Sequence, residues 1–117
     1  MSEIPDLFPE NPLVIFPGEA NKIANGNNAA AIVTLAAAVY GQWAVGIVTV
    51  GYNDTPTGGL LTVNDSATPV FQVPITQSGS IPIPVYRYGG RGAPMTIVLS
   101  AGGNGITGYL NVEAAQI

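Results

Sequence analysis

The side chains best suited to binding a partner gather in one short stretch, Tyr86-Arg87-Tyr88-Gly89-Gly90-Arg91. Two of the three basic residues of the chain lie here, within five positions and beside two tyrosines. Arg and Tyr are enriched at the energetic centres of protein interfaces, because both offer a broad contact area and directed hydrogen bonds. The stretch predicts contact with a neighbouring subunit through Tyr86, Arg87, Tyr88 and Arg91. A solvated loop, or a ring stacked on a sugar or base, are the alternatives.

The sequence contains few of the residues that catalysis and metal binding use. Histidine and cysteine are both absent, so the usual general base, the thiol nucleophile and any disulfide are missing. Asp54 and Asp65 each follow an asparagine in a turn-like segment, where such side chains bond their own backbone. No loop is rich enough in Asp to hold calcium, and the glycine-rich segments 56–59 and 89–92 lack the lysine of a phosphate-binding loop. We expect no enzymatic activity, no metal site and no cofactor.

Charge is scarce along the whole chain. Seven acidic and three basic residues make up 9% of the 117 positions and give a net charge of −4, whereas an ordinary soluble domain has roughly 25% charged residues. Three basic residues are too few to neutralise a nucleic-acid backbone, and nucleic acid is therefore not an expected partner. A surface this poor in charge favours a protein that works in an assembly. We expect a homo-oligomer, with a trimer favoured.

The first 20 residues differ from the rest and are expected to form an extended N-terminal arm. They hold four of the ten prolines and four of the seven acidic residues. Proline fixes φ and biases the preceding residue toward extended conformations. Seven large apolar side chains lie between the prolines, which favours an arm that binds another polypeptide over a disordered tail. These predicted partner-binding residues are Ile4, Leu7, Phe8, Leu13, Val14, Ile15 and Phe16, the last four forming a candidate short strand.

Residues 21–117 are predicted to be one all-β domain, an antiparallel β-sandwich of seven to eight short strands with jelly-roll or immunoglobulin-like connections. Fifteen glycines and ten prolines interrupt the chain too often for long helices. The segment 20–28 is predicted to be a turn-rich link. Apolar, β-branched runs between turn residues predict strands at about 30–35, 43–52, 60–63, 68–76, 81–86, 95–101 and 106–113.

Two of the strand pairs are predicted to be hairpins. Residues 43–63 contain the first, around the loop Asn53-Asp54-Thr55-Pro56-Thr57-Gly58-Gly59. Residues 95–113 contain the second, closed by Gly102-Gly103-Asn104-Gly105. Both loops are rich in residues that accept the conformations of tight turns.

Strand 81–86 is predicted to lie at the edge of a sheet. Pro82 and Pro84 are two positions apart, so both lack a hydrogen-bond donor along the same side of the strand. Prolines in this arrangement also protect the edge from pairing with another strand.

The stretch between Lys22 and Asp54 contains no charged residue, so a membrane-spanning helix has to be considered. Gly41-Gln42 interrupts the stretch, and Lys22 alone gives no positive-inside signal. Two buried strands joined by a turn at 39–42 explain the pattern better, with Trp43 and Tyr52 in or beside the core. We therefore expect no membrane partner, although a small membrane protein stays an alternative.

Five blocks of the domain carry a family resemblance. They are residues 30–38, 41–42, 45–52, 55–63 and 92–112. In this order they resemble a group of small β-sandwich proteins encoded by tailed bacteriophages. By analogy with small phage β proteins of this size, the resemblance implies a head decoration, or cement, protein without cofactor or catalytic residues. The proline-rich arm departs from the shared pattern.

On this resemblance and on the apolar arm, we expect a phage virion structural protein that stabilises the head as a capsid decoration protein. It would bind the major capsid protein and neighbouring copies on the capsid surface, after assembly in the host cytoplasm. The arm would align by strand addition and bury its apolar side chains on the partner. The alternatives are a glycan- or host-surface-binding module of a tail or fibre, which would use Tyr86 and Tyr88, and a small membrane protein.

Overall fold

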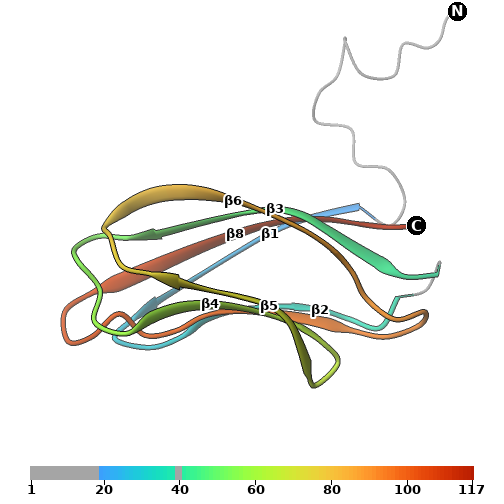
Figure 1. Cartoon of the computed structure of the whole chain (residues 1–117), viewed down its shortest axis with the longest axis horizontal. Helices are drawn as coiled ribbons and strands as arrows, with labels where there is room; N and C mark the ends of the chain where they lie inside the picture. The colour runs from blue at the N-terminus through green and yellow to red at the C-terminus, as the bar shows by residue number, and fades with distance from the viewer. Residues whose placement is uncertain (1–18, 39–40) are drawn as a thin grey trace, which may run out of the picture.

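The computed structural model describes residues 19–38 and 41–117, which form two stacked antiparallel sheets (Figure 1). This arrangement confirms the predicted all-β sandwich, and no helix in the described part of the chain is long and apolar enough to cross a membrane. The strands are β1 (Glu19–Asn27), β2 (Ala31–Leu35), β3 (Trp43–Tyr52), β4 (Gly59–Asp65), β5 (Thr68–Ile75), β6 (Gly79–Tyr88), β7 (Met95–Leu99) and β8 (Thr107–Gln116).

The strands pair from the two ends of the chain inward. The first sheet, sheet A, has the order β1-β8-β3-β6, and sheet B has the order β2-β7-β4-β5. The first strand thus pairs with the eighth, the second with the seventh, the third with the sixth and the fourth with the fifth. This pairing is that of a jelly roll, which decides between the two topologies that the sequence left open.

Both predicted hairpins are wrong. β3 belongs to sheet A and β4 to sheet B, and β7 and β8 are divided between the sheets in the same way. The loops after Tyr52 and after Leu99 therefore cross from one sheet to the other. The apolar residues of the flanking strands face the same core in either arrangement, and turn residues mark only where the chain reverses. The hairpin that does form joins β4 to β5.

The predicted turn-rich link at 20–28 is also wrong, because nearly all of it belongs to strand β1. This strand pairs with β8 over its whole length, from Glu19 opposite Ala115 to Asn27 opposite Thr107. Its largest described apolar side chain, Ile23, is 79% exposed. The backbone ladder with β8, rather than a buried apolar face, stabilises this strand. Strands are predicted from alternating apolar residues that form a buried face, and β1 has no such face, so the sequence did not indicate this strand.

The edge position predicted for β6 is confirmed. β6 is the last strand of sheet A and β5 the last strand of sheet B, and both edges lie on the same side of the sandwich. Pro82 and Pro84 on β6, and Pro69 and Pro74 on β5, are all exposed. Proline cannot donate to a further strand, so both edges of this side are protected from pairing.

The core lies between the sheets, and the predicted core positions Trp43 and Tyr52 are 6% and 2% exposed. They stand at the two ends of β3. Trp43 Nε1 donates to the carbonyl oxygen of Ala36 at 2.7 Å, and Tyr52 Oη donates to that of Ser100 at 2.6 Å. β3 is thereby tied to segments beside strands of the opposite sheet. A Cβ atom at Gly102 would lie 2.8 Å from the Tyr52 ring, so only glycine fits there.

Candidate functional site: the outer face of sheet A

The predicted partner-binding residues of the arm are not placed by the structure. Ile4, Leu7, Phe8, Leu13, Val14, Ile15 and Phe16 lie outside the described residues, and their role stays a prediction. The described chain begins at Glu19, the first residue of β1.

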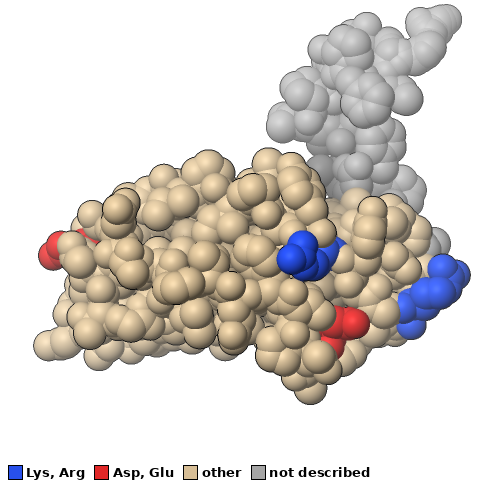
Figure 2. Space-filling view, viewed as in Figure 1, with Lys and Arg blue, Asp and Glu red and all other residues tan. Residues whose placement is uncertain are grey.

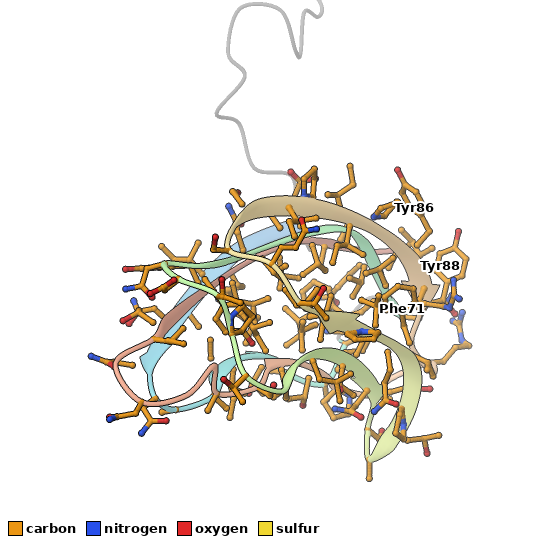
Figure 3. The ribbon with its side chains drawn as sticks, turned by 60° about the vertical axis from the view of Figure 1, so that its left-hand side comes forward. Phe71, Tyr86 and Tyr88 are labelled. Carbon is orange, nitrogen blue, oxygen red and sulfur yellow. The ribbon has the colours of Figure 1, made fainter. Side chains whose placement is uncertain are left out.

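Tyr86 and Tyr88 lie on the outer side of β6, whereas Phe71 of β5 lies between the two layers (Figure 3). The two tyrosines are 65% and 62% exposed. The ladder to β3 is irregular here, with Arg87 opposite Val45 but Pro84 opposite Ile47, so β6 contains one extra residue. Tyr86, within this bulge, has a φ of +48°. A β-bulge of this kind changes the direction of the side chains beside it.

The side chain of Arg87 forms hydrogen bonds within its own chain. Its Nη1 donates to the carbonyl of Val85 at 3.0 Å, and its Nε donates to the carbonyl of Val70 at 3.3 Å. Its guanidinium also lies 5.3 Å from the centre of the Phe71 ring. Val70 is the extra residue of a bulge in β5, because Phe71 lies opposite Val63 but Pro69 opposite Asn64. Arg87 therefore donates a hydrogen bond to the backbone carbonyl of the bulge residue in β5, and in this way it connects the two edge strands β5 and β6.

Arg91 lies in the loop between β6 and β7 rather than on a sheet. The amide of Gly92 donates to the carbonyl of Gly41 at 2.7 Å, and the amide of Gly90 donates to Asp65 Oδ1 at 3.0 Å. The prediction that Asp65 bonds its own turn is thus wrong, because its carboxylate holds a distant loop. Asp54 does bond its own turn, where Oδ1 accepts from the amide of Thr55 at 2.8 Å.

A second group of outward-facing residues extends across all four strands of sheet A, and sequence reasoning missed it as a site. In the ladder these residues form two rows, each with one residue from β1, β8, β3 and β6. The rows are Ile23, Asn111, Thr49 and Pro82, and then Asn25, Tyr109, Gly51 and Ser80. The alternation of β8 could have revealed Tyr109, since its neighbours Gly108 and Leu110 are buried.

These rows border a shallow groove of about 470 Å³. Its lining includes Ile23, Asn25, Gly51, Tyr109 and Asn111, and contains no charged residue. Gly51 places no side chain in the groove, and a Cβ atom added there would come into contact with the carbonyl oxygen of Gly79 at 3.4 Å. Asn25 and Asn111 are both exposed, and their side-chain amides form no hydrogen bond with another described residue.

The outer face of sheet A, meaning the outward-facing residues of β1, β8, β3 and β6, concentrates apolar surface. Of the six exposed large apolar side chains of the described chain, four belong to it: Ile23, Tyr86, Tyr88 and Tyr109. Glu113 is its charged residue among the side chains that the structure describes. On the adjoining side, formed by β5 and β6, charged side chains occupy only small separate patches (Figure 2). The face thus has the composition of a contact surface.

Comparisons with known proteins add little to this site. No protein-family model matches the chain, and no curated protein is significantly similar to it in sequence. Among solved structures, the chain is similar to a chain of the virus-like particle of the extra small virus of the giant freshwater prawn Macrobrachium rosenbergii. The TM-score is 0.33 and the identity 14%, over 97% of this chain and 88% of that one. A TM-score this low carries no argument for function. The resemblance to phage proteins and the glycan-binding alternative both stay predictions.

Proposed function

We propose that this protein is a virion structural protein, and specifically a capsid decoration protein. The outer face of sheet A would lie against the major capsid protein or a neighbouring copy. The observation that carries the proposal is that four of the six exposed large apolar side chains of the described chain, Ile23, Tyr86, Tyr88 and Tyr109, belong to one face that has little charge. Ile23 and Tyr109 lie together towards one end of this face, and Tyr86 and Tyr88 lie towards the other. Exposed apolar surface marks interaction sites, and tyrosine is prominent among the residues that dominate binding.

Two further points support the viral part of the proposal. Jelly rolls are common in viral capsid domains, although the fold also serves lectins and enzymes, so this support is an analogy. The resemblance of residues 30–112 to small phage proteins points in the same direction. The low charge of the whole chain fits a protein whose surface is covered in an assembly.

The expected affinity of a single copy is modest. Burying four such side chains fully would contribute on the order of 6–12 kcal/mol, at roughly 1.5–3 kcal/mol each. Lost translational and rotational freedom opposes association by about 4–15 kcal/mol. Additional contacts from the arm, or the simultaneous engagement of several copies on a symmetric shell, would provide the remaining free energy.

The test is sedimentation of the protein with empty shells of its major capsid protein. Tyr109→Lys on the outer face of sheet A should reduce the bound fraction at least tenfold, because a buried unpaired ammonium costs several kcal/mol. Thr34→Lys, on the exposed outer face of sheet B, is the matched control and should bind normally. Equal binding of both variants would contradict the proposed face, and failure of the unmodified protein to bind shells would contradict the proposed function.

The contribution of the arm is tested by removing residues 1–18. The deletion should stop there, because β1 begins at Glu19 and a longer deletion would remove part of the ladder with β8. If the arm binds the shell as predicted, the shortened protein decorates shells more weakly than the full chain. Unchanged affinity would limit binding to the outer face of sheet A.

A further inference from the structure

The edge of sheet A that β1 forms is built differently from the edge that β6 forms. β1 pairs with β8 over nine residues without a break in register, and it contains no proline. The ladders of β5 and β6 both contain bulges, and both strands have exposed prolines. Bulges and prolines keep an edge strand from pairing with another chain. A regular edge strand without proline is a template to which a further strand can add.

Two hydrogen bonds at the end of the ladder between β1 and β8 show which residues of β1 face the free edge. The amide of Asn28 donates to the carbonyl of Ile106 in the direction of β8, at 2.9 Å. The carbonyl of Thr107 instead accepts from the amide of Asn53 on the side of β3, at 3.1 Å. Because bonded and non-bonded positions alternate along an antiparallel ladder, every second residue of β1 directs its amide and carbonyl away from β8. These residues are Asn21, Ile23, Asn25 and Asn27, and no described strand pairs with them on that side.

The residues along this edge have a self-complementary order. Ile23 is 79% exposed, more than any other large apolar side chain of the described chain. If a two-fold axis passes beside Ile23, each Ile23 lies opposite its own copy, and Asn21 lies opposite Asn25 of the second copy. All of these positions carry free backbone groups, so each pair exchanges both of its hydrogen bonds. The pairing also removes the apolar side chain of Ile23 from water.

Charge does not oppose this pairing. Lys22 is the charged residue of β1 whose side chain the structure describes, and it is exposed. In the pairing about Ile23 it lies opposite Ala24 of the second copy and not opposite another lysine, which would destabilise the ladder. A two-fold axis perpendicular to sheet A also keeps the outer faces of both copies on the same side, so the two four-stranded sheets continue into one.

We propose that β1 pairs antiparallel with β1 of a second copy, about a two-fold axis at Ile23. The same residues form both halves of this interface, so it closes at two copies. β6 then lies at both ends of the combined sheet, where Pro82 and Pro84 prevent further growth. The interface forms in the free protein and does not depend on the proposed function.

The full chain contains no cysteine, so disulfide formation can test the register. In the paired strands the two Ile23 Cα atoms lie about 5.5 Å apart, a separation that a disulfide bridges. In the absence of shells, mild oxidation of Ile23→Cys should therefore give a covalent dimer. Asn25→Cys should not, because Asn25 lies opposite Asn21 and its two copies are at least about 13 Å apart. Thr34→Cys, on the outer face of sheet B, measures linkage by random collision.

Sedimentation velocity measures the dimer that forms without a disulfide. Asn25→Pro removes an amide donor at the free edge but none of the bonds to β8, and it should raise the dissociation constant of the dimer at least tenfold. Asn25→Ala keeps this donor and is the matched control, which should dimerise like the unmodified protein. If Asn25→Pro disturbs β1, the cysteine variants decide the question, because they keep every amide.

Several results would overturn the proposal. The unmodified protein would be a monomer or a trimer, Asn25→Pro would dimerise as tightly as Asn25→Ala, or Asn25→Cys would form the covalent dimer as readily as Ile23→Cys. A monomer whose free-edge amides resist hydrogen exchange would mean that another segment of the same chain covers β1. Shell sedimentation is measured separately, so a dimer that does not bind shells would contradict the proposed function and leave this interface standing.

Discussion

Among the exposed tyrosines of the described chain, Tyr86 alone has a positive φ angle. Its φ of +48° lies in the left-handed region, which costs an L residue roughly 1–2 kcal/mol. Asn28 and Ser66 also have positive φ, but small polar residues bond locally in turns and tolerate this region better. A large ring, 65% exposed, gains little burial in return. Strained residues of this kind often serve binding, which supports a contact role for the ring.

Tyr86→Gly should therefore separate stability from binding. Glycine relieves the strain of roughly 1–2 kcal/mol but adds roughly 0.5–1 kcal/mol of unfolded-chain entropy. We expect a free energy of unfolding that is unchanged or up to about 1.5 kcal/mol higher, measured by urea denaturation, together with weaker shell binding. Tyr88→Gly, where φ is not positive, is the control and should lose stability. A clear loss of stability in Tyr86→Gly would show that the ring supports the fold instead.

Tyr52 permits a prediction about pH. Burial raises the pKa of its hydroxyl above 10.0, although the hydrogen bond to Ser100 opposes this shift. The folded state then retains the phenolic proton more tightly than the unfolded state, so stability is constant below the unfolded pKa and falls as the pH rises above it. Urea denaturation from about pH 8 to about pH 11 should show this decline.

Tyr52→Phe should remove the part of the decline that Tyr52 causes. It should also lower stability at neutral pH by about 1–2 kcal/mol, because the carbonyl of Ser100 loses its donor. The four other tyrosines of the chain still ionise in this variant, so they provide the internal reference. An identical alkaline profile in both proteins would contradict the assignment.

At the scale of elements, the two open sides of the sandwich are built differently. The side formed by β5 and β6 has exposed prolines on both edges, and Arg87 connects the two strands through Val70 and Phe71. On the opposite side, β1 and β2 contain no proline. Edge strands expose unpaired backbone groups that invite pairing with another chain. The protein therefore excludes strand addition on one side and leaves it open on the other.

Replacing Pro82 and Pro84 by valine should remove this protection. The double variant regains two amide donors along the free edge of β6, while valine keeps a high strand propensity. We expect concentration-dependent self-association, measured by light scattering, in a protein whose stability is unchanged or higher. Thr34→Val, a similar apolar substitution on β2, should stay dispersed like the unmodified protein. A dispersed double variant would mean that the bulges, rather than the prolines, protect this edge.

The sequence predicted strands well and their partners poorly. Apolar runs between turn residues gave most of the strands, and the proline spacing gave the edge position of β6, because both depend on local geometry. Pairing depends on contacts between distant segments, so a crossover such as the loop after Tyr52 looked like a hairpin. The groove was missed because it needs Ile23, Gly51 and Tyr109 from three strands whose register no local pattern contains.

At the scale of the whole molecule, the outer face of sheet A and the scarcity of charge lead to a prediction about salt. Glu113 is the charged side chain described on that face, so Coulombic attraction should contribute little to binding. The Debye length shortens from about 10 Å at 0.1 M to about 3 Å at 1 M, which weakens charged contacts and leaves apolar ones intact. Shell binding should change less than twofold between about 0.05 M and about 0.5 M sodium chloride, and ammonium sulfate should strengthen it.

The measurement is quantitative sedimentation at fixed shell concentration, with Tyr109→Lys as the variant that should acquire salt sensitivity. A fall of tenfold or more for the unmodified protein would mean that charged residues, and not the tyrosines and Ile23, dominate the contact.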